Sequence, residues 1–230
     1  MRLVHARGDS HDSIEAMIAV VAVGWVADTD GLDLDRAGVQ TDPRGYVRVD
    51  SRLRTTAPHI FAAGDVTGRS MVVHEAVRQA YVAATNVAIG PTTTLREHVS
   101  PIGSFTDPEY ASVGPTEARA REAHDVLVAR ARFDSLPRPI IDGRPTGFCK
   151  LVVDRRRHSI LGCHIVGERA VELAQLAAVA IAGGMRVEEL ALVPFSFPTY
   201  ANALGRAAIS AVTKLQPDVT GDIRGTTTQT

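Results

Sequence analysis

The stretch TTAPHIFAAGDV, Thr55 to Val66, constrains the fold more than any other part of the chain. A short apolar run, Ile60 to Ala63, stops at Gly64 and is followed at once by the carboxylate of Asp65. Such a run predicts a buried strand, and in a parallel sheet a strand presents ligand-contacting residues at its carboxyl end. Glycine lets the backbone approach a bound molecule, and aspartate accepts hydrogen bonds from sugar-like hydroxyls. The stretch therefore predicts either a ligand-binding α/β region or a core strand with a polar turn.

The composition is typical of a globular protein without nucleic-acid or membrane partners. The 230 residues suffice for one large or two small domains, with an ordinary 45% hydrophobic and 22% charged content. The net charge of −1 gives no reason to expect nucleic acid or an anionic membrane as a partner. The apolar run from Ala16 to Ala27 is too short for a membrane span and follows acidic residues, unlike a signal peptide. We expect a cytoplasmic protein.

Neither the histidines nor the cysteines predict a metal site. The eight histidines are scattered without metal-ligand spacing. Cys149 and Cys163 lie in a predicted hairpin whose turn is centred on Arg156 and Arg157. This register pairs Cys149 with His164 and places Cys163 on the opposite face, although a register slip would undo the arrangement. We expect both cysteines to be reduced core or strand residues rather than a disulfide.

The first of two blocks combines short strands with one helix. A strand-like run over Met17–Val23 is followed by turn chemistry at Asp42–Gly45 and by alternation over Tyr46–Val49. The strand over Ile60–Ala63 comes next, and helical spacing then predicts an amphipathic helix over Val72–Ile89. The apolar positions of that helix are Val73, Val77, Ala80, Ala84 and Val87.

The second block mixes strands and helices in α+β fashion and follows the polar stretch GPTTTLREH. The pattern predicts a strand broken at Asp107-Pro108, a second short strand, a helix over 115–123, a strand over 125–133, the cysteine hairpin, a helix over 168–182 and a last helix over 200–212. Gly183-Gly184 is a good stop for the long helix. The Gly/Thr-rich tail over 218–230 is expected to be disordered.

Six motifs, in this order, resemble the pyridine nucleotide-disulfide oxidoreductases, the family of dihydrolipoamide dehydrogenase, glutathione reductase and mercuric reductase. They are AVGWVADTDGLDLDRAGV, HIFAAGDV, SFTDPEYASVG, GFCKLVVD, ILGCHIVGERAVEL and SFPTYANALGRAA. The resemblance covers roughly residues 20–215 and implies an α/β region followed by an α+β domain. It implies a partial FAD/NAD(P)-binding Rossmann-like region over 1–90, a linker over 91–98, a dimerisation domain over 99–215 and a tail over 216–230. It also implies a homodimer whose two-fold interface is formed by the 168–182 helix and the last helix.

The same resemblance implies the residues that contact FAD. Asp65 would hydrogen-bond the ribitol chain, and the helix start at Met71–His74 would direct backbone N–H groups at the pyrimidine edge of the flavin. A helix N-terminus has unsatisfied donors and a positive dipole end, which suits an electron-rich carbonyl. Judged by local chemistry alone, the same residues form an ordinary helix start. The implied cofactor-binding residues are Gly64, Asp65, Met71, Val72, Val73 and His74.

Three motifs of complete family members do not occur in the sequence. They are the Gly-x-Gly-x-x-Gly fingerprint for FAD, its counterpart for NAD(P), and the redox-active Cys-x4-Cys. The pyrophosphate of FAD needs the backbone cradle of the first fingerprint, so we expect this chain alone to hold FAD weakly or not at all. NAD(P) is expected only in the parent protein. We expect the chain to be a carboxyl-terminal portion of a larger flavoenzyme, with a separately encoded N-terminal half as one conceivable partner.

The carboxyl-terminal motif departs from the family pattern. Thiol-processing members carry His-Pro-x-x-x-Glu, and here Phe197 and Asn202 occupy the His and Glu positions. Phenylalanine cannot carry a proton and asparagine has no charge to orient a histidine, so no catalytic residue is assigned. We expect the parent to pass electrons from NAD(P)H through FAD to a non-dithiol acceptor such as a quinone, with Tyr200 packed rather than acting as a substitute acid. The alternative is a non-catalytic dimerisation or assembly module.

Overall fold

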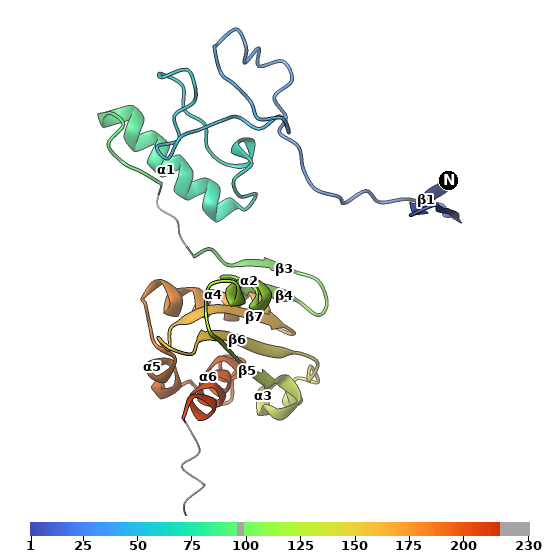
Figure 1. Ribbon diagram of the computed structural model, residues 1–230. Helices are drawn as coiled ribbons and strands as arrows, with labels where there is room; N and C mark the ends of the chain where they lie inside the picture. Colours follow the sequence, from blue (N-terminus) through green and yellow to red (C-terminus); the bar gives the residue numbers. More distant parts are fainter. Residues whose placement is uncertain (96–98, 217–230) are drawn as a thin grey trace, which may run out of the picture. The chain divides into compact units, whose positions relative to one another are not determined.

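The computed structural model describes residues 1–95 and 99–216 (Figure 1). These residues form two compact units, one up to Leu95 and the other from Val99 onward. The first unit contains a β-hairpin, a long irregular stretch and one α-helix, and the second contains an antiparallel sheet and five α-helices. Residues 96–98 of the predicted linker and the tail predicted over 218–230 lie outside the described residues.

The chain begins with a hairpin that the sequence patterns do not predict. Strands β1 (Arg2–Arg7) and β2 (Ser10–Glu15) pair antiparallel with each other and with no other described strand. The strand predicted over Met17–Val23 is wrong, because residues 16–29 form neither helix nor strand. Val20 and Val23 are 86% and 91% exposed. A strand needs a neighbour to pair its backbone N–H and C=O groups, and no described strand lies beside this run.

The middle of the first unit is held by turns and single bridges. The predicted turn at Asp42–Gly45 is confirmed, with the Gly45 N–H donating to the Asp42 carbonyl at 2.9 Å. The strand predicted over Ile60–Ala63 is wrong. This run is only half buried and forms one isolated bridge, between Arg54 and Phe61. Without a second strand alongside, its apolar residues pack against loop residues and the helix that follows instead of a sheet.

Helix α1 (Val73–Ile89) confirms the predicted helix. The apolar positions expected to face the core are instead exposed. Val73, Val77 and Val87 are 80%, 64% and 65% exposed. The buried residues of the helix are Glu75, Gln79, Val82, Ala83 and Asn86. The inner face covers irregular backbone, whose N–H and C=O groups need hydrogen-bonding side chains, so polar residues are buried there.

The second unit is a five-stranded antiparallel sheet in the order β3-β4-β7-β6-β5. Its strands are β3 (Ile102–Ser104), β4 (Tyr110–Val113), β5 (Val126–Arg132), β6 (Phe148–Asp154) and β7 (Ile160–Val166). Its helices are α2 (Glu117–Arg121), α3 (Pro137–Ile141), α4 (Ala170–Ala182), α5 (Val187–Leu192) and α6 (Asn202–Leu215). The predicted strands and helices of this block are confirmed, and α3 and α5 are additional.

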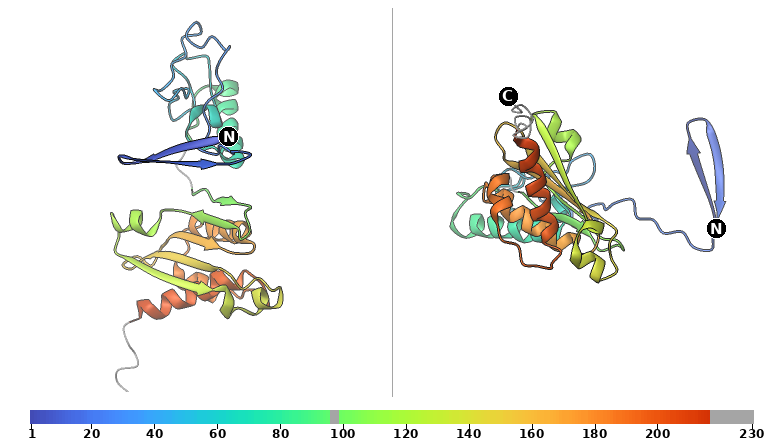
Figure 2. Two further views of the ribbon diagram at one scale, coloured as in Figure 1. Left: turned by 90° about the vertical axis from the view of Figure 1, so that its right-hand side faces the viewer. Right: turned by 90° about the horizontal axis from the view of Figure 1, so that it is seen from below.

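The main core lies between the sheet and helices α4 and α6, which cover the same face (Figure 2). Alternating residues of β6 separate the two faces. Leu151 and Val153 point into this core, whereas Val152 packs with Ala120 of α2 on the other face. All three β6 residues are fully buried. The sheet is therefore covered on both sides near β6.

The cysteine hairpin is shifted by one residue from the predicted register. Lys150 lies opposite His164, so Cys149 pairs with Ile165. The shift arises because a β-bulge between Val152 and Val153 adds a residue to β7. Cys149 and Cys163 consequently share the core face, with their Sγ atoms 3.7 Å apart and both thiols free, as expected. The neighbouring Cys149 thiol and burial raise the pKa of Cys163.

Candidate functional site

The residues predicted to contact a cofactor centre on a tight turn, residues 64–68, called here the Gly64 turn. Gly64 is buried and has φ +79° and ψ −155°, a region that essentially only glycine adopts. A Cβ atom at this position would lie 3.3 Å from the Cβ atom of Ala76 in α1. The Thr67 N–H donates to the Gly64 carbonyl at 3.0 Å, which closes the short 3-10 helix Asp65–Thr67. The turn therefore requires glycine both for its backbone and for its approach to α1.

Gln79 of α1 connects the helix to this turn. Its Oε1 atom accepts the Gly64 N–H at 2.9 Å and lies 3.3 Å from the Thr67 hydroxyl. The side chain is 1% exposed. Apolar periodicity does not single it out, although Glu75, Gln79 and Asn86 recur at helical spacing and could have indicated a polar inner face.

The predicted cofactor residues take different positions around the turn. Asp65 is exposed directly after the buried Gly64, Met71 and Val72 are half buried, and Val73 and His74 are exposed. Helix α1 begins at Val73 with no side-chain cap. The Gly64 turn, which carries Asp65, lies against the first turn of α1, because a Cβ atom at Gly64 would approach the Cβ atom of Ala76 to 3.3 Å. Their contact with flavin stays a prediction.

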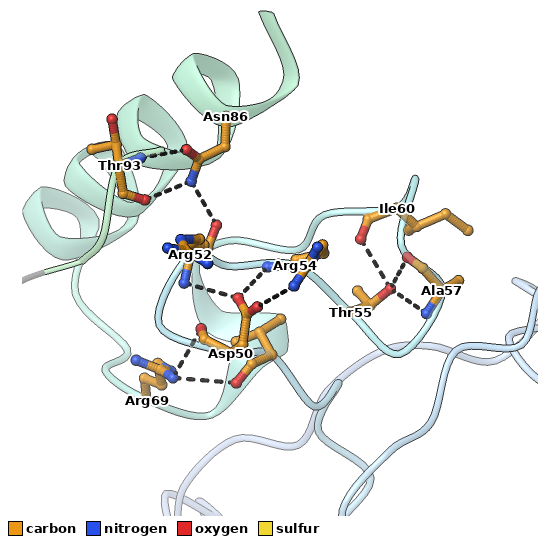
Figure 3. Close-up of polar contacts among 10 residues, drawn as sticks. Asp50, Arg52, Arg54, Thr55, Ala57, Ile60, Arg69, Asn86 and Thr93 are labelled. Carbon is orange, nitrogen blue, oxygen red and sulfur yellow. Dashed lines mark hydrogen bonds and ion pairs between the residues drawn. The ribbon is translucent and has the colours of Figure 1, made fainter. Parts of the chain in front are cut away.

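A second turn stabilises the loop that precedes the Gly64 turn (Figure 3). Asp50 Oδ1 accepts the backbone N–H groups of Arg52 and Arg54 at 2.8 and 3.0 Å, and Arg54 Nη2 lies 3.3 Å from Asp50 Oδ2. Burial acts to raise the pKa of Asp50, but these N–H groups and the guanidinium outweigh it and hold the pKa below its ordinary value. Arg69, just after the Gly64 turn, donates to the carbonyls of Val49 and Asp50 at 3.3 Å. The two turns are therefore fastened to each other.

Asn86 attaches the far end of α1 to the same loop (Figure 3). Its Nδ2 donates to the carbonyls of Arg52 and Thr93 at 2.9 and 2.7 Å, and its Oδ1 accepts the Thr93 N–H at 2.8 Å. Asn86 is 2% exposed. Two buried amides of α1, Gln79 in its middle and Asn86 near its end, thus fix the irregular backbone around the candidate site.

In the Phe197–Asn202 segment, the two positions that hold His and Glu in thiol-processing family members carry no proton-transferring side chain. Phe197 precedes a cis peptide bond to Pro198 and is 74% exposed. Asn202 uses its Oδ1 to accept the Thr199 N–H at 3.2 Å, so it caps its own turn. The segment borders a cavity of about 550 Å³ lined by Ser135, Leu136, Pro137, Ala191, Val193, Phe195, Phe197, Asn202, Gly205, Arg206 and Ile209. Neither Phe197 nor Asn202 can supply acid–base chemistry to this cavity.

Tyr200 packs, as expected. It is 5% exposed, and its ring centroid lies 5.9 Å from that of Phe133. The Arg169 guanidinium lies 5.9 Å from the centroid of the Tyr200 ring. Burial, with the nearby Asp142 carboxylate, raises the pKa of Tyr200 to about 12. The hydroxyl therefore stays protonated at neutral pH and is a poor proton donor there.

Comparison with known families divides the chain in the same way as the two compact units. The pyridine nucleotide-disulphide oxidoreductase profile matches residues 2–80, and the profile of the dimerisation domain of the same group matches residues 100–208. The chain belongs to the pyridine nucleotide-disulphide oxidoreductase family, whose members use FAD and NAD(P).

The relatives include dihydrolipoyl dehydrogenases. That of Thermus scotoductus is 36% identical over 204 residues, 88% of this chain and 44% of the relative. That of Haloferax volcanii is 38% identical over 195 residues, 84% of this chain and 41% of the relative. The crystal structure of LpdA from Mycobacterium tuberculosis superposes with a TM-score of 0.77 at 27% identity, covering 90% of this chain and 47% of that one. The chain spans about two fifths of the length of these curated relatives.

Two further structural findings bear on the class of site. Among residues 1–95 and 99–216, no three His, Cys, Asp or Glu side chains gather as a metal would require. None of the helices in the same ranges has the length and apolar content needed to cross a lipid bilayer.

Proposed function

We propose that this chain supplies part of an FAD site in a flavin-dependent pyridine nucleotide oxidoreductase. The Asp65 carboxylate would accept hydrogen bonds from the ribitol hydroxyls, and the start of α1, Met71–His74, would face the polar edge of the flavin. Support comes from the exposed Asp65 beside the buried, glycine-specific turn at Gly64. When bound, FAD supplies the transfer of electrons from NAD(P)H. The pyrophosphate cradle would come from a fingerprint-bearing region outside this sequence.

The acceptor in the whole protein is proposed to be a non-dithiol compound such as a quinone. The observation that carries this proposal is the Phe197–Asn202 segment, where a phenylalanine and a self-capping asparagine replace a proton-shuttling pair. A disulfide acceptor is reduced to a dithiol, so a protonated side chain must give a proton to the departing thiolate, and Phe197 has no group that can do so. Tyr200 in the same segment is buried and its pKa is raised to about 12, so it is a poor substitute donor.

The proposal is tested on the protein purified natively from its source cells, with any partner chains retained. A bound flavin spectrum and NAD(P)H-dependent reduction of a benzoquinone, with reduction of lipoamide lower by at least about 10²-fold, would support it. Equal or faster lipoamide reduction would contradict the non-dithiol assignment. A colourless preparation that takes up no added FAD would contradict the flavin site.

The second candidate is a non-catalytic dimerisation or assembly module of the same family. It is favoured by the absence from this sequence of both Gly-rich fingerprints and by the well-packed core of the second unit. A colourless protein that nevertheless forms a stable dimer supports this candidate over catalysis. The proposed boundaries, 1–90 for the partial cofactor region and 99–215 for the dimerisation domain, are common to both candidates.

We further propose a homodimer formed through α4 and α6. Large exposed apolar side chains lie on these helices and on the segment between them, namely Leu176, Val179, Leu192, Phe197 and Ile209. Exposed apolar surface is a feature of many interfaces. A separately encoded N-terminal half, carrying the fingerprints, is the proposed partner of the exposed apolar face of α1 in a split enzyme.

A further inference from the structure

The Gln79 side chain contacts two residues of the Gly64 turn. Its Oε1 accepts the Gly64 N–H at 2.9 Å and lies 3.3 Å from the Thr67 hydroxyl. That hydroxyl makes its shorter contact, 2.8 Å, with the Gly64 carbonyl. Buried to 1% exposure, the Gln79 amide oxygen is shielded from water, which would otherwise compete for both donors.

The Gly64 N–H depends on this acceptor because no strand pairing is available to it. The run before it, Ile60–Ala63, forms a single bridge instead of a ladder. Within the described residues, the Gly64 N–H donates to no backbone carbonyl. A buried N–H without an acceptor is strongly unfavourable. Losing the Gln79 oxygen would therefore favour a different backbone conformation at Gly64.

The backbone of Gly64 also needs an external constraint. Its φ of +79° and ψ of −155° lie in a sparsely populated region that persists only when the surroundings determine it. Asp65 follows directly, so the conformation of Gly64 sets the direction in which the exposed carboxylate leaves the turn. Ala76 limits the space for a side chain at this position, since an added Cβ atom would lie 3.3 Å from its Cβ atom, but it provides no directional bond to Gly64.

We propose that Gln79 is a positioning residue for the cofactor site, holding the Gly64 turn so that Asp65 is presented to the hydroxyls of the ligand. The role of Gln79 in cofactor binding rests on the proposed flavin site, whereas its stabilisation of the Gly64 turn does not. Gln79 acts through the Gly64 N–H and does not itself touch the cofactor.

The hold on the turn is tested by amide hydrogen exchange measured by NMR on the full chain. Gln79→Met keeps the length of the side chain but removes the acceptor, and we expect the Gly64 amide to exchange about tenfold faster or more. Gln79→Glu keeps an acceptor and should retain protection. Tyr81→Phe, on the exposed side of α1 with Tyr81 73% exposed, is the matched control. Unchanged Gly64 exchange in Gln79→Met would overturn the proposal.

A pH titration separates positioning from general loss of folding. In Gln79→Glu the Gly64 amide shift should titrate with the introduced carboxyl, whose pKa burial raises, while the wild-type shift does not follow such a titration. This measurement decides the case even where Gln79→Met fails to fold. A Gly64 shift that is insensitive to the new carboxyl would contradict the proposed contact.

FAD binding to the same variants, prepared with any partner chains retained and followed by quenching of flavin fluorescence, tests the consequence for the ligand. We expect Gln79→Met to weaken FAD binding about tenfold and Gln79→Glu to stay close to wild type. If the wild type and Gln79→Met bind FAD with equal affinity although the Gly64 amide exchanges faster in the variant, the positioning role is overturned. If the wild type itself takes up no FAD, the proposed flavin site fails and the positioning role toward FAD fails with it, while amide exchange separately decides whether Gln79 holds the turn.

Discussion

Gly64 combines an unusual backbone conformation with a close neighbour, and the two costs can be separated. At φ +79° a Cβ atom is strained, and at this site it would also lie 3.3 Å from Ala76 Cβ. Gly64→Ala should therefore lower the free energy of unfolding by about 1–3 kcal/mol from conformation alone, and more from the contact. Gly45 is the matched control, because its φ is +87° and a Cβ atom there would have no neighbour within 4 Å.

Urea unfolding followed by circular dichroism measures both variants. Gly45→Ala should lose only the conformational part, so Gly64→Ala should be the less stable of the two. A loss at Gly45 as large as that at Gly64 would show that contact with α1 contributes nothing.

Single residues also mark the limit of prediction from sequence. Tyr200 could be assigned to packing because an isolated aromatic residue beside a helix is most simply a core residue, and it is 5% exposed. Gln79 could not be assigned, because its importance depends on Gly64, fifteen residues away, arriving at its side chain. A local sequence pattern carries no information on a contact between residues so far apart in the chain.

At the scale of the element, the β6–β7 hairpin depends on a buried carboxylate. Asp154 Oδ1 accepts the N–H groups of Arg156 and Arg157 at 2.8 and 2.9 Å, and Oδ2 lies 2.8 Å from His124 Nδ1. The Arg157 N–H, together with the Arg156 N–H and the His124 ring, lowers the pKa of Asp154 against the opposing effect of burial. A carboxyl whose folded pKa is lowered stabilises the fold above its unfolded pKa, about 3.9.

Asp154→Asn should therefore cost about 1–3 kcal/mol of unfolding free energy at neutral pH. The difference from wild type should shrink as the pH falls below about 4 and Asp154 becomes protonated in the wild type. Urea unfolding across this pH range checks the prediction. Asp125→Asn, at an exposed carboxylate 3.7 Å from Arg155, is the control and should change stability by less than about 0.5 kcal/mol. A difference for Asp154→Asn that does not vary with pH would contradict the assigned role.

The strands and helices of the second unit were predictable because the periodicity and the stop signals of each lie within its own segment of sequence. Strand β5 and helix α4 have local periodicity and clear stops, and both predictions are confirmed. The hairpin register was not predictable, because one bulge between Val152 and Val153 moves every subsequent pair by one residue. In the first unit, the strands predicted over 17–23 and 60–63 failed because a strand exists only beside another strand.

At the scale of the whole molecule, the apolar surface on α6 makes the dimer testable. Ile209→Lys places a charge on the proposed interface, and the desolvation of that charge should weaken dimerisation at least about tenfold. Ile102→Lys in β3 is the matched control, because Ile102 is 49% exposed, close to the 46% of Ile209, and lies at the opposite edge of the sheet. Light scattering with size-exclusion chromatography at micromolar concentration measures the outcome. A wild-type monomer, or equal weakening by both variants, would contradict the proposed interface.

The sequence by itself determined the family, the order of elements in the second unit and the departure at Phe197 and Asn202. These follow from residue types and spacings that are read locally. Tertiary structure alone decided which face of α1 is buried, which residues lie opposite the cysteines in the sheet and what holds the Gly64 turn. Each of these depends on a partner distant in the chain, because burial and hydrogen bonding are set by the surface a residue meets after folding.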